Sequence, residues 1–252
     1  LFGWKGIDGY RRFRVAYVET AKGSGKSPLA AGIGMKGLVA DNEPRAEVYS
    51  AATKKDQAMI LFRDAVAMLD QSPELSKRLT KSGTGERCWN LAYVAQGAFF
   101  RPISSDDGQS GPRPHIGLID ELHEHKANTV VEMMRAGTKS RRQALIFMIT
   151  NAGHNRMGPC WSYHEYGAKV AAGEVEDDAF FPFVCGLDES DDPFADESCW
   201  PKANPSLQDA DLPGMKYIRE QVVEAKGMPS KEAIVRRLNF CQWTDAESPW
   251  IS

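Results

Sequence analysis

One short segment has the residue types and spacing of a phosphate-binding loop. Residues 20–27 read TAKGSGKS, which matches the pattern G-x-x-x-x-G-K-[ST] except that Thr20 stands at the first position. Glycines allow a tight backbone path whose N–H groups face one anion, and the helix that should follow adds the positive end of its dipole. Lys26 would then reach the terminal phosphates, and the Ser27 hydroxyl would ligate Mg²⁺. An ordinary turn without a ligand is the alternative.

We therefore expect this loop to bind the phosphates of ATP. Lys22 would add positive charge over the phosphates, although a surface lysine would look the same in the sequence. The expected contacts come from consecutive residues: Ala21, Lys22, Gly23, Ser24, Gly25, Lys26 and Ser27.

Two adjacent carboxylates follow a short apolar run. Residues 116–119 read IGLI and are followed by Asp120 and Glu121. A buried parallel strand delivers its last residues to the carboxyl edge of the sheet, where a phosphate-binding loop also lies. We predict that Asp120 holds Mg²⁺ through water and that Glu121 orients and deprotonates the attacking water. The alternative is an acidic pair that favours the positive end of the next helix.

A second apolar run also ends in polar residues. Residues 145–149 precede Thr150 and Asn151, which we expect at the same edge, placed to sense the terminal phosphate. A plain turn at the end of a strand is the alternative.

Two rival functions use the same part of the chain. His123 and His125 follow the acidic pair directly, and histidines beside carboxylates are typical of a metal-dependent hydrolase. On a helix these two side chains would project about 200° apart, so joint ligation would need an extended chain. The second rival is a nucleotide-binding switch without turnover, which would not need a water-activating carboxylate.

The elements that would position these residues alternate in type. Apolar runs predict strands and the segments between them predict helices, as in a mostly parallel sheet covered on both faces. Gly32, Gly34 and Gly37 would let the first helix lie close to that sheet. The predicted strands are residues 13–19, 46–51, 97–103, 116–119 and 144–150, the predicted helices are residues 26–40 and 56–69, and residues 104–114 predict an exposed loop.

This alternation is expected to stop after about residue 155. Ser162 and Glu165 predict a capping box at the start of a short helix, and a largely irregular acidic stretch follows. Two closing helices are expected at residues 215–226 and 230–243. We therefore expect residues 1–155 to form a P-loop ATPase core and residues 156–252 to form a small lid or linker subdomain.

Composition excludes several classes of protein. With 252 residues, of which 42% are hydrophobic and 26% charged, the chain is typical of soluble globular proteins rather than disordered or collagen-like ones. Its apolar runs fall far short of the roughly 18 residues that cross a bilayer. The five cysteines are scattered and contain no C-x-x-C pair, which favours a reducing, intracellular setting. Because the acidic residues concentrate at 170–201, the rest of the chain is basic, which is compatible with a nucleic-acid partner.

The motifs together resemble the ATPase domain of terminase large subunits, the DNA-packaging motors of tailed bacteriophages. The resemblance implies an α/β fold of the P-loop NTPase class (ASCE type), with a mostly parallel central sheet flanked by helices and a small C-terminal helical lid. It implies an Mg²⁺-dependent ATPase that drives double-stranded viral DNA into a procapsid. The matching segments are AKGSGKS at residues 21–27, YSAATKKDQA at 49–58, LIDELHEH at 118–125, TNAG at 150–153, DDPFADESCWPKANPSL at 191–207 and RRLNFCQWTDAESPWI at 236–251.

The resemblance also implies partners and residue roles. The expected partners are double-stranded DNA, the portal protein and the terminase small subunit, in the host cytoplasm and transiently at the procapsid portal, without a membrane. A homo-oligomeric ring is expected on the procapsid, with a monomer as the alternative in isolation. Glu121, Lys26 and Lys22 are the expected catalytic residues, with Lys22 as a charge-stabilising finger. The family's nuclease domain is expected beyond residue 252, outside this chain.

An arginine that acts across subunits is also implied by the resemblance. The candidates, chosen as near the catalytic edge, are Arg101, Arg113, Arg135, Arg141 and Arg142.

Overall fold

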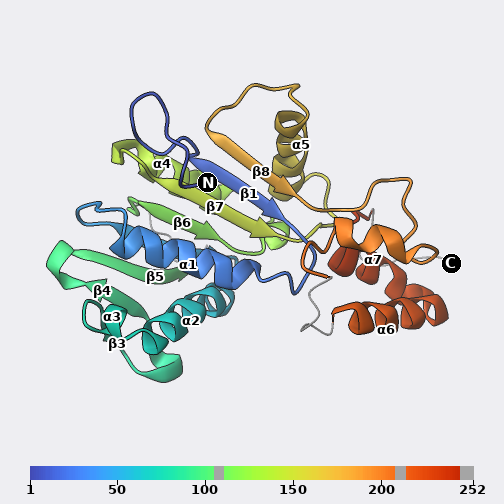
Figure 1. Ribbon diagram of the computed structural model, residues 1–252, viewed down its shortest axis with the longest axis horizontal. Coiled ribbons are helices and arrows are strands. Elements are labelled where there is room, and N and C mark those ends of the chain that lie inside the picture. Colours follow the sequence, from blue (N-terminus) through green and yellow to red (C-terminus); the bar gives the residue numbers. More distant parts are fainter. Residues whose placement is uncertain (105–110, 208–213, 245–252) are drawn as a thin grey trace.

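The computed structural model describes residues 1–104, 111–207 and 214–244 (Figure 1). Residues 105–110 of the predicted loop at 104–114, and residues 245–251 of the motif at 236–251, lie outside these ranges. Within the described ranges, no helix is both long enough and apolar enough to cross a membrane.

An eight-stranded sheet lies at the centre of the described structure, with the strand order β3-β4-β5-β2-β6-β7-β1-β8. Neighbouring strands from β5 to β8 run parallel, whereas β3 and β4 add an antiparallel edge. The parallel strands therefore all present their carboxyl ends at one edge of the sheet. The strands are β1 (Val15–Glu19), β2 (Glu47–Ala52), β3 (Thr80–Ser82), β4 (Asn90–Tyr93), β5 (Ala98–Ser104), β6 (Ile116–Ile119), β7 (Leu145–Thr150) and β8 (Phe180–Val184).

The five strands predicted from apolar runs are confirmed within two residues at each end. The structure adds β3, β4 and β8, which were not predicted. Because β8 pairs with β1, the sheet continues past residue 155, and the expectation that the alternation stops there is wrong. The sequence FFPFV contains Pro182, which is tolerated because β8 is an edge strand, and its largely half-buried or exposed side chains lack the continuous apolar run of a buried strand.

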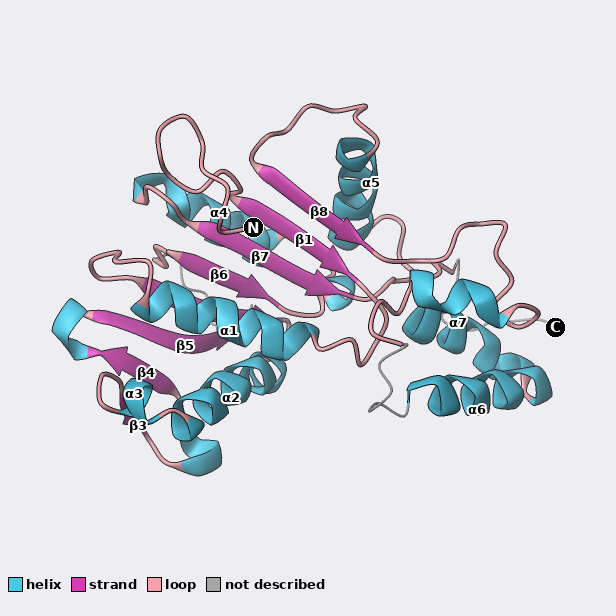
Figure 2. Ribbon diagram, in the orientation of Figure 1, coloured by secondary structure: helices cyan, strands magenta, loops and turns pink. Residues whose placement is uncertain are grey.

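Helices cover both faces of the sheet (Figure 2). α5 begins at Pro159, which suits a first helical turn because its missing N–H is not needed there. Ser162 and Glu165 therefore lie inside the helix, and the capping box predicted for them is wrong. The helices are α1 (Lys26–Val39) and α2 (Lys55–Gln71) on one face, followed by the short α3 (Pro73–Ser76), α4 (Thr129–Gly137) and α5 (Pro159–Ala171) on the other face, and the pair α6 (Gly214–Gly227) and α7 (Glu232–Phe240) beyond the carboxyl ends of the strands.

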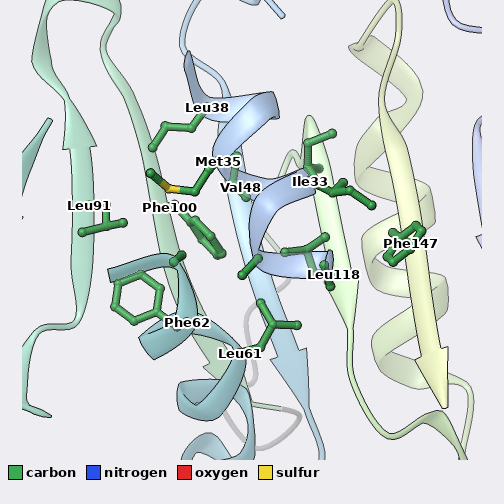
Figure 3. Close-up of a cluster of buried hydrophobic side chains, with 14 of the residues drawn as sticks. Ile33, Met35, Leu38, Val48, Leu61, Phe62, Leu91, Phe100, Leu118 and Phe147 are labelled. Atoms are coloured by element: carbon green, nitrogen blue, oxygen red, sulfur yellow. The ribbon is translucent and has the colours of Figure 1, made fainter. Parts of the chain in front are cut away.

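An apolar cluster fills the layer on each side of the sheet. Between the sheet and α1 and α2, the side chains of Phe62, Phe100 and Leu118 are fully buried (Figure 3). The neighbouring Ile119 belongs to the cluster on the other face, together with Met148. α4 and α5 cover this second cluster. Successive strand residues thus serve opposite faces, and since both faces are covered, the strands read as continuous apolar runs.

α1 lies very close to the sheet at two of its glycines. A Cβ atom added to Gly37 would lie 2.2 Å from Ile116 Cγ1, and one added to Gly34 would lie 2.8 Å from a ring carbon of Phe100. At Gly32 the nearest atom would be the terminal methyl carbon of Met68, at 4.0 Å. The close approach predicted from these glycines is confirmed at Gly34 and Gly37 and is wrong at Gly32. Since α1 begins at Lys26, its distance from the sheet also sets how far the preceding loop lies from the sheet.

We predict that Gly37→Ala lowers the free energy of unfolding, because a methyl group at this position must displace the buried Ile116 side chain. Overpacking of this kind costs about 1–3 kcal/mol, which exceeds the gain of roughly 1 kcal/mol in helix propensity. Gly32→Ala is the matched control and should be neutral or stabilising. Denaturant unfolding of both variants checks the difference, and equal stabilisation of both would contradict the packing shown here.

Candidate active site

The loop between β1 and α1 is held by its own hydrogen bonds and by the C-terminal part of the chain. Gly23 and Gly25 have φ values of 83° and 73°, in the left-handed region that favours glycine, and Ser24 Oγ donates to the carbonyl oxygen of Ala21 at 2.8 Å. The backbone N–H of Ala21 donates to Ala203 O at 3.2 Å, and that of Lys22 donates to the α7 residue Leu238 at 2.8 Å. The loop is therefore fixed between the sheet and the helical pair.

The ammonium group of Lys26 lies at the carboxyl edge of β1 and β7. Its Nζ donates to Thr20 O at 2.8 Å, to Ala21 O at 2.9 Å and to Asn151 Oδ1 at 2.8 Å. Burial lowers the pKa of Lys26, and the negative charges of Glu121 and other nearby acidic groups oppose that shift. The loop lysine is therefore surrounded by oxygen atoms and is close enough to the acidic pair for their charges to interact.

The acidic pair follows β6 directly and makes a sharp turn. Glu121 has φ 48°, a left-handed conformation that costs a residue with a side chain about 1–2 kcal/mol, and its backbone N–H donates to Asp120 Oδ1 at 2.9 Å. The side chain of Asp120 is buried, and burial, followed by the charge of Glu121, raises the pKa of Asp120 to about 7. A buried carboxylate, Asp120, is thus held beside a partly exposed one, Glu121.

Thr150 and Asn151 connect the loop lysine to the acidic pair. Asn151 binds Lys26, and Thr150 Oγ1 accepts a hydrogen bond from the His123 backbone at 3.0 Å and lies 3.1 Å from His123 Nδ1. That same Nδ1 lies 3.2 Å from Glu121 Oε2. The structure therefore brings the predicted residues of β1, β6 and β7 to one edge, through contacts that run from Lys26 to Glu121.

The two histidines of this segment face different groups. His123 lies between Glu121 and Glu124, whereas His125 Nε2 lies 3.3 Å from the carbonyl oxygen of Asp120. Burial lowers the pKa of both histidines. In the ranges that the structure covers, no group of three or more His, Cys, Asp or Glu residues is arranged to hold a metal ion.

Other predicted residues lie on the rim of the site or away from it. Ser27 is half-buried in the first turn of α1, and the Lys22 side chain is exposed beside the loop. Arg113, Arg141 and Arg142 come just before β6 or β7 and lie at the amino edge of the sheet, where Arg141 donates to the backbone of residue 45 at 2.8 Å. Their expected position near the catalytic edge is wrong, because a residue that precedes a parallel strand lies at the opposite edge from one that follows it.

The two remaining arginine candidates contact aromatic side chains, one at a ring face and one at a hydroxyl group. Arg101, in β5, lies over the Phe99 ring with its Cζ 4.0 Å from the centroid. Arg135, in α4, donates to Tyr163 Oη at 3.1 Å.

A pocket of about 580 Å³ opens between the loop and the helical pair. No local pattern in the sequence indicates it, because it forms where apolar positions of α6 and α7 face a loop far away in the sequence. Its walls combine three loop residues with apolar, amide and hydroxyl side chains and one further lysine: Lys22, Gly23, Ser24, Asn204, Ser206, Leu207, Gly214, Tyr217, Ile218, Gln221, Lys231, Ile234, Val235, Leu238 and Asn239.

A fully buried carboxylate, Glu19, stands at the end of β1 and was also not predicted. Its Oε2 accepts from Tyr17 Oη at 2.5 Å and lies 2.9 Å from His164 Nδ1, while its Oε1 accepts from Trp243 Nε1 at 3.1 Å. The signal in the sequence is a glutamate that ends an otherwise apolar strand.

Two curated proteins are similar to this chain in sequence. Protein YmfN of Escherichia coli (strain K12) is 30% identical over 146 residues, which cover 56% of this chain and 30% of that protein. The terminase large subunit of Enterobacteria phage HK97 is 23% identical over 244 residues, which cover 94% of this chain and 46% of that protein. The chain spans less than half the length of these curated relatives.

Solved structures of phage terminases share the fold. The large terminase of bacteriophage HK97 matches with a TM-score of 0.78 at 22% identity, over 92% of this chain and 47% of that one. The ATPase domain of the Thermus phage P74-26 large terminase matches with a TM-score of 0.64 at 15% identity, over 96% of both chains. The large terminase of another thermophilic bacteriophage, in complex with ADP, matches with a TM-score of 0.55 at 14% identity, over 92% of this chain and 48% of that one. The predicted α/β P-loop fold is confirmed.

Two family models together cover almost the whole chain. The endonuclease domain of the terminase large subunit matches residues 174–252, so the expectation that this chain carries no part of the nuclease domain is wrong. Those residues resembled a lid because they include an irregular acidic stretch and the paired helices, and in the structure they add β8 to the sheet and pack α7 against the loop. The ATPase domain of the terminase large subunit matches residues 1–169, well over half of the chain. The chain therefore belongs to the terminase large-subunit family.

Proposed function

We propose that this chain hydrolyses ATP at the strand-end site and that hydrolysis drives double-stranded viral DNA into a procapsid. The observation that carries the proposal is the series of contacts from Lys26 through Asn151 and Thr150 to His123 and Glu121. Loop amides, a cation and two carboxylates in one site are the groups that phosphoryl transfer to water requires. The role in DNA packaging is supported by membership of the terminase family.

The donor atoms at the site fit Mg²⁺. Asp120 and Glu121 are adjacent carboxylates at the buried end of β6, and the raised pKa of Asp120 reflects burial and repulsion by its neighbour. A divalent cation would relieve that repulsion, and carboxylate and hydroxyl oxygens are ligands that Mg²⁺ prefers. We propose that Asp120, through water, and the Ser27 hydroxyl hold this ion. When bound, it would neutralise charge on the phosphate oxygens.

The side chains of the site then have separate roles. Glu121 accepts a proton from the attacking water, and Lys26 moves from its backbone acceptors to the terminal phosphate. Asn151 and Thr150 change their contacts when that phosphate is released, because Asn151 binds Lys26 and Thr150 contacts His123 beside Glu121. Positioning and charge neutralisation supply most of the rate in such a mechanism.

The rest of the nucleotide is proposed to lie beside the loop. The phosphates would contact residues 21–27, and Lys22, exposed at the mouth of the pocket, would stabilise charge that develops on them. The pocket has apolar walls from α6 and α7 and is large enough for a nucleoside. The helical pair would then act as the lid, within the region predicted at residues 156–252.

The partners are proposed from the family alone. We propose that the chain works as part of a longer protein in a homo-oligomeric ring on the procapsid portal in the host cytoplasm, with the small subunit and double-stranded DNA.

ATP hydrolysis measured with and without linear double-stranded DNA tests the function directly. Turnover that no nucleotide-site variant alters would exclude this site as its source.

We predict that Glu121→Gln retains ATP binding and loses turnover, because the amide cannot accept the proton of the attacking water. A positioned general base contributes about 10²–10⁴-fold to a rate, so phosphate release should fall by that factor while calorimetric binding stays the same. Glu124→Gln is the matched control, since Glu124 also contacts His123 but is half-exposed. Equal rates in the two variants would contradict the role of Glu121.

We predict that Lys26→Ala weakens ATP binding as well as turnover. Charge-assisted hydrogen bonds contribute about 1.5–3 kcal/mol, so the dissociation constant should rise roughly 10- to 100-fold. Lys77→Ala, which removes an exposed lysine paired with Glu74, is the control and should bind as the wild type does. Titration calorimetry gives both constants, and an unchanged affinity for Lys26→Ala would count against the loop as the phosphate site.

We predict that Asp120→Asn raises the melting temperature of the metal-free protein, and more at pH 8 than at pH 5. The pKa of Asp120 is about 7 in the folded chain against an ordinary value of 3.8, so between these values folding takes up a proton and stability falls as pH rises. Above pH 7 the buried charge is fully present, and asparagine removes it. Thermal unfolding in a chelator at both pH values is the measurement, and the same gain at both would refute the assignment.

A further inference from the structure

The indole of Trp243 contacts both chain segments that hold Lys26. Trp243 follows α7, and its Nε1–H donates to Glu19 Oε1 at 3.1 Å, at the end of the strand that leads into the loop. The edge of the same ring lies against the turn after β7, because a Cβ on Gly153 would be 3.0 Å from Trp243 Cζ3. Trp243 also packs with a small cluster that includes Ala21 and Ala152, one residue from each segment.

The bond from Trp243 is one of the hydrogen bonds that surround a fully buried carboxylate. Glu19 is not exposed to solvent, and its other carboxylate oxygen is bound by Tyr17 and His164. A buried carboxylate that loses a hydrogen-bond donor costs free energy, because water does not reach it to replace that donor. Removal of the indole N–H would therefore disturb this group. The charge of Glu19 also acts on Lys26, where it opposes the lowering of the lysine pKa by burial.

The contact with Gly153 acts on the other side of Lys26. The turn from Thr150 to Gly153 presents Asn151 Oδ1 to Lys26 and Thr150 Oγ1 to His123. The ring of Trp243 is itself fixed, since it packs edge-on to Trp161 with 4.8 Å between centroids and lies 5.4 Å from the His164 ring. The turn therefore rests on a ring that has little freedom to move.

We propose that Trp243 is a positioning residue for ATP hydrolysis, which holds the end of β1 and the turn after β7 in register and links them to the segment after α7. The inference rests on the proposed function at the same site. When a phosphate binds Lys26, Asn151 loses its donor, and the turn that carries Asn151 shifts against the fixed indole. The surroundings of the Trp243 ring then differ between the nucleotide-free and nucleotide-bound chain. Trp243 lies in the region that matches the endonuclease-domain model, so the link joins the nucleotide site to that region.

The test uses the whole chain with Trp243→Phe, which keeps an aromatic ring and removes the N–H donor. We expect kcat for ATP to fall on the order of tenfold with KM within about twofold, because displaced catalytic groups slow chemistry more than they weaken binding. The tryptophan emission of the wild-type chain is expected to change when ADP is added, and Trp243→Phe should lose this change. Trp4→Phe removes a largely exposed tryptophan and should keep the wild-type kcat and the ADP signal.

Gly153→Ala tests the same link if Trp243→Phe does not fold. It adds one methyl group 3.0 Å from the indole edge and 3.3 Å from His123 Cβ, and it leaves the donor to Glu19 in place. The same split between kcat and KM is expected, and a changed ADP signal distinguishes an effect on the indole from one on His123. A folded Trp243→Phe protein, or where that variant does not fold a folded Gly153→Ala protein, with wild-type kcat and the full ADP signal would overturn the inference and leave the proposed function intact. A wild-type chain that binds no nucleotide would overturn the proposed function and this inference with it.

Discussion

The ammonium group of Lys26 must be surrounded by oxygen atoms, because a largely buried charge cannot rely on water. Three acceptors within 2.9 Å meet this need, and they come from the loop and from the turn after β7. These segments can meet only if β1 and β7 are neighbours that end at the same edge, and the parallel register places Glu19 opposite Thr150. β6 is the next strand beyond β7, so the acidic pair arrives at the same edge.

The loop that carries Lys26 is fixed on both sides. On the sheet side, Gly34 and Gly37 let α1 approach the strands closely, and this sets the position of the first helical turn. On the other side, two loop amides donate to carbonyl oxygens of the C-terminal part, at Ala203 and Leu238. The helical pair therefore helps to form the site and does not only cover it. Its position is part of what gives the loop its shape, so a movement of these helices would act directly on the phosphate-binding backbone.

Local pattern predicted the elements that carry the site, and long-range pairing supplied what it missed. A loop with two glycines between an apolar run and a helix, and apolar runs that end in Asp120 or Thr150, are signals contained in single segments. β8 is an edge strand with a proline, and its pairing with β1 has no local signal. The pocket and the bond from Trp243 to Glu19 join positions far apart in the chain. Arg113, Arg141 and Arg142 were placed at the wrong edge although their positions just before β6 or β7 already indicate the amino ends of those strands.

The two buried carboxylates at this edge have opposite environments, and the difference separates a structural role from a chemical one. Glu19 accepts from Tyr17 and Trp243 and contacts His164, so its oxygen atoms are already used within the protein. Asp120 accepts from the backbone of Glu121 but also has that residue's charge beside it, and its pKa rises to about 7. Glu121 itself is held in a left-handed conformation that glycine would adopt at lower cost. A cation would offset the repulsion between Asp120 and Glu121, whereas the oxygen atoms of Glu19 already have donors within the protein. Burial alone therefore does not distinguish the two carboxylates, and the negative charge of Glu121 beside Asp120 is what supports the proposal that Asp120 holds a cation.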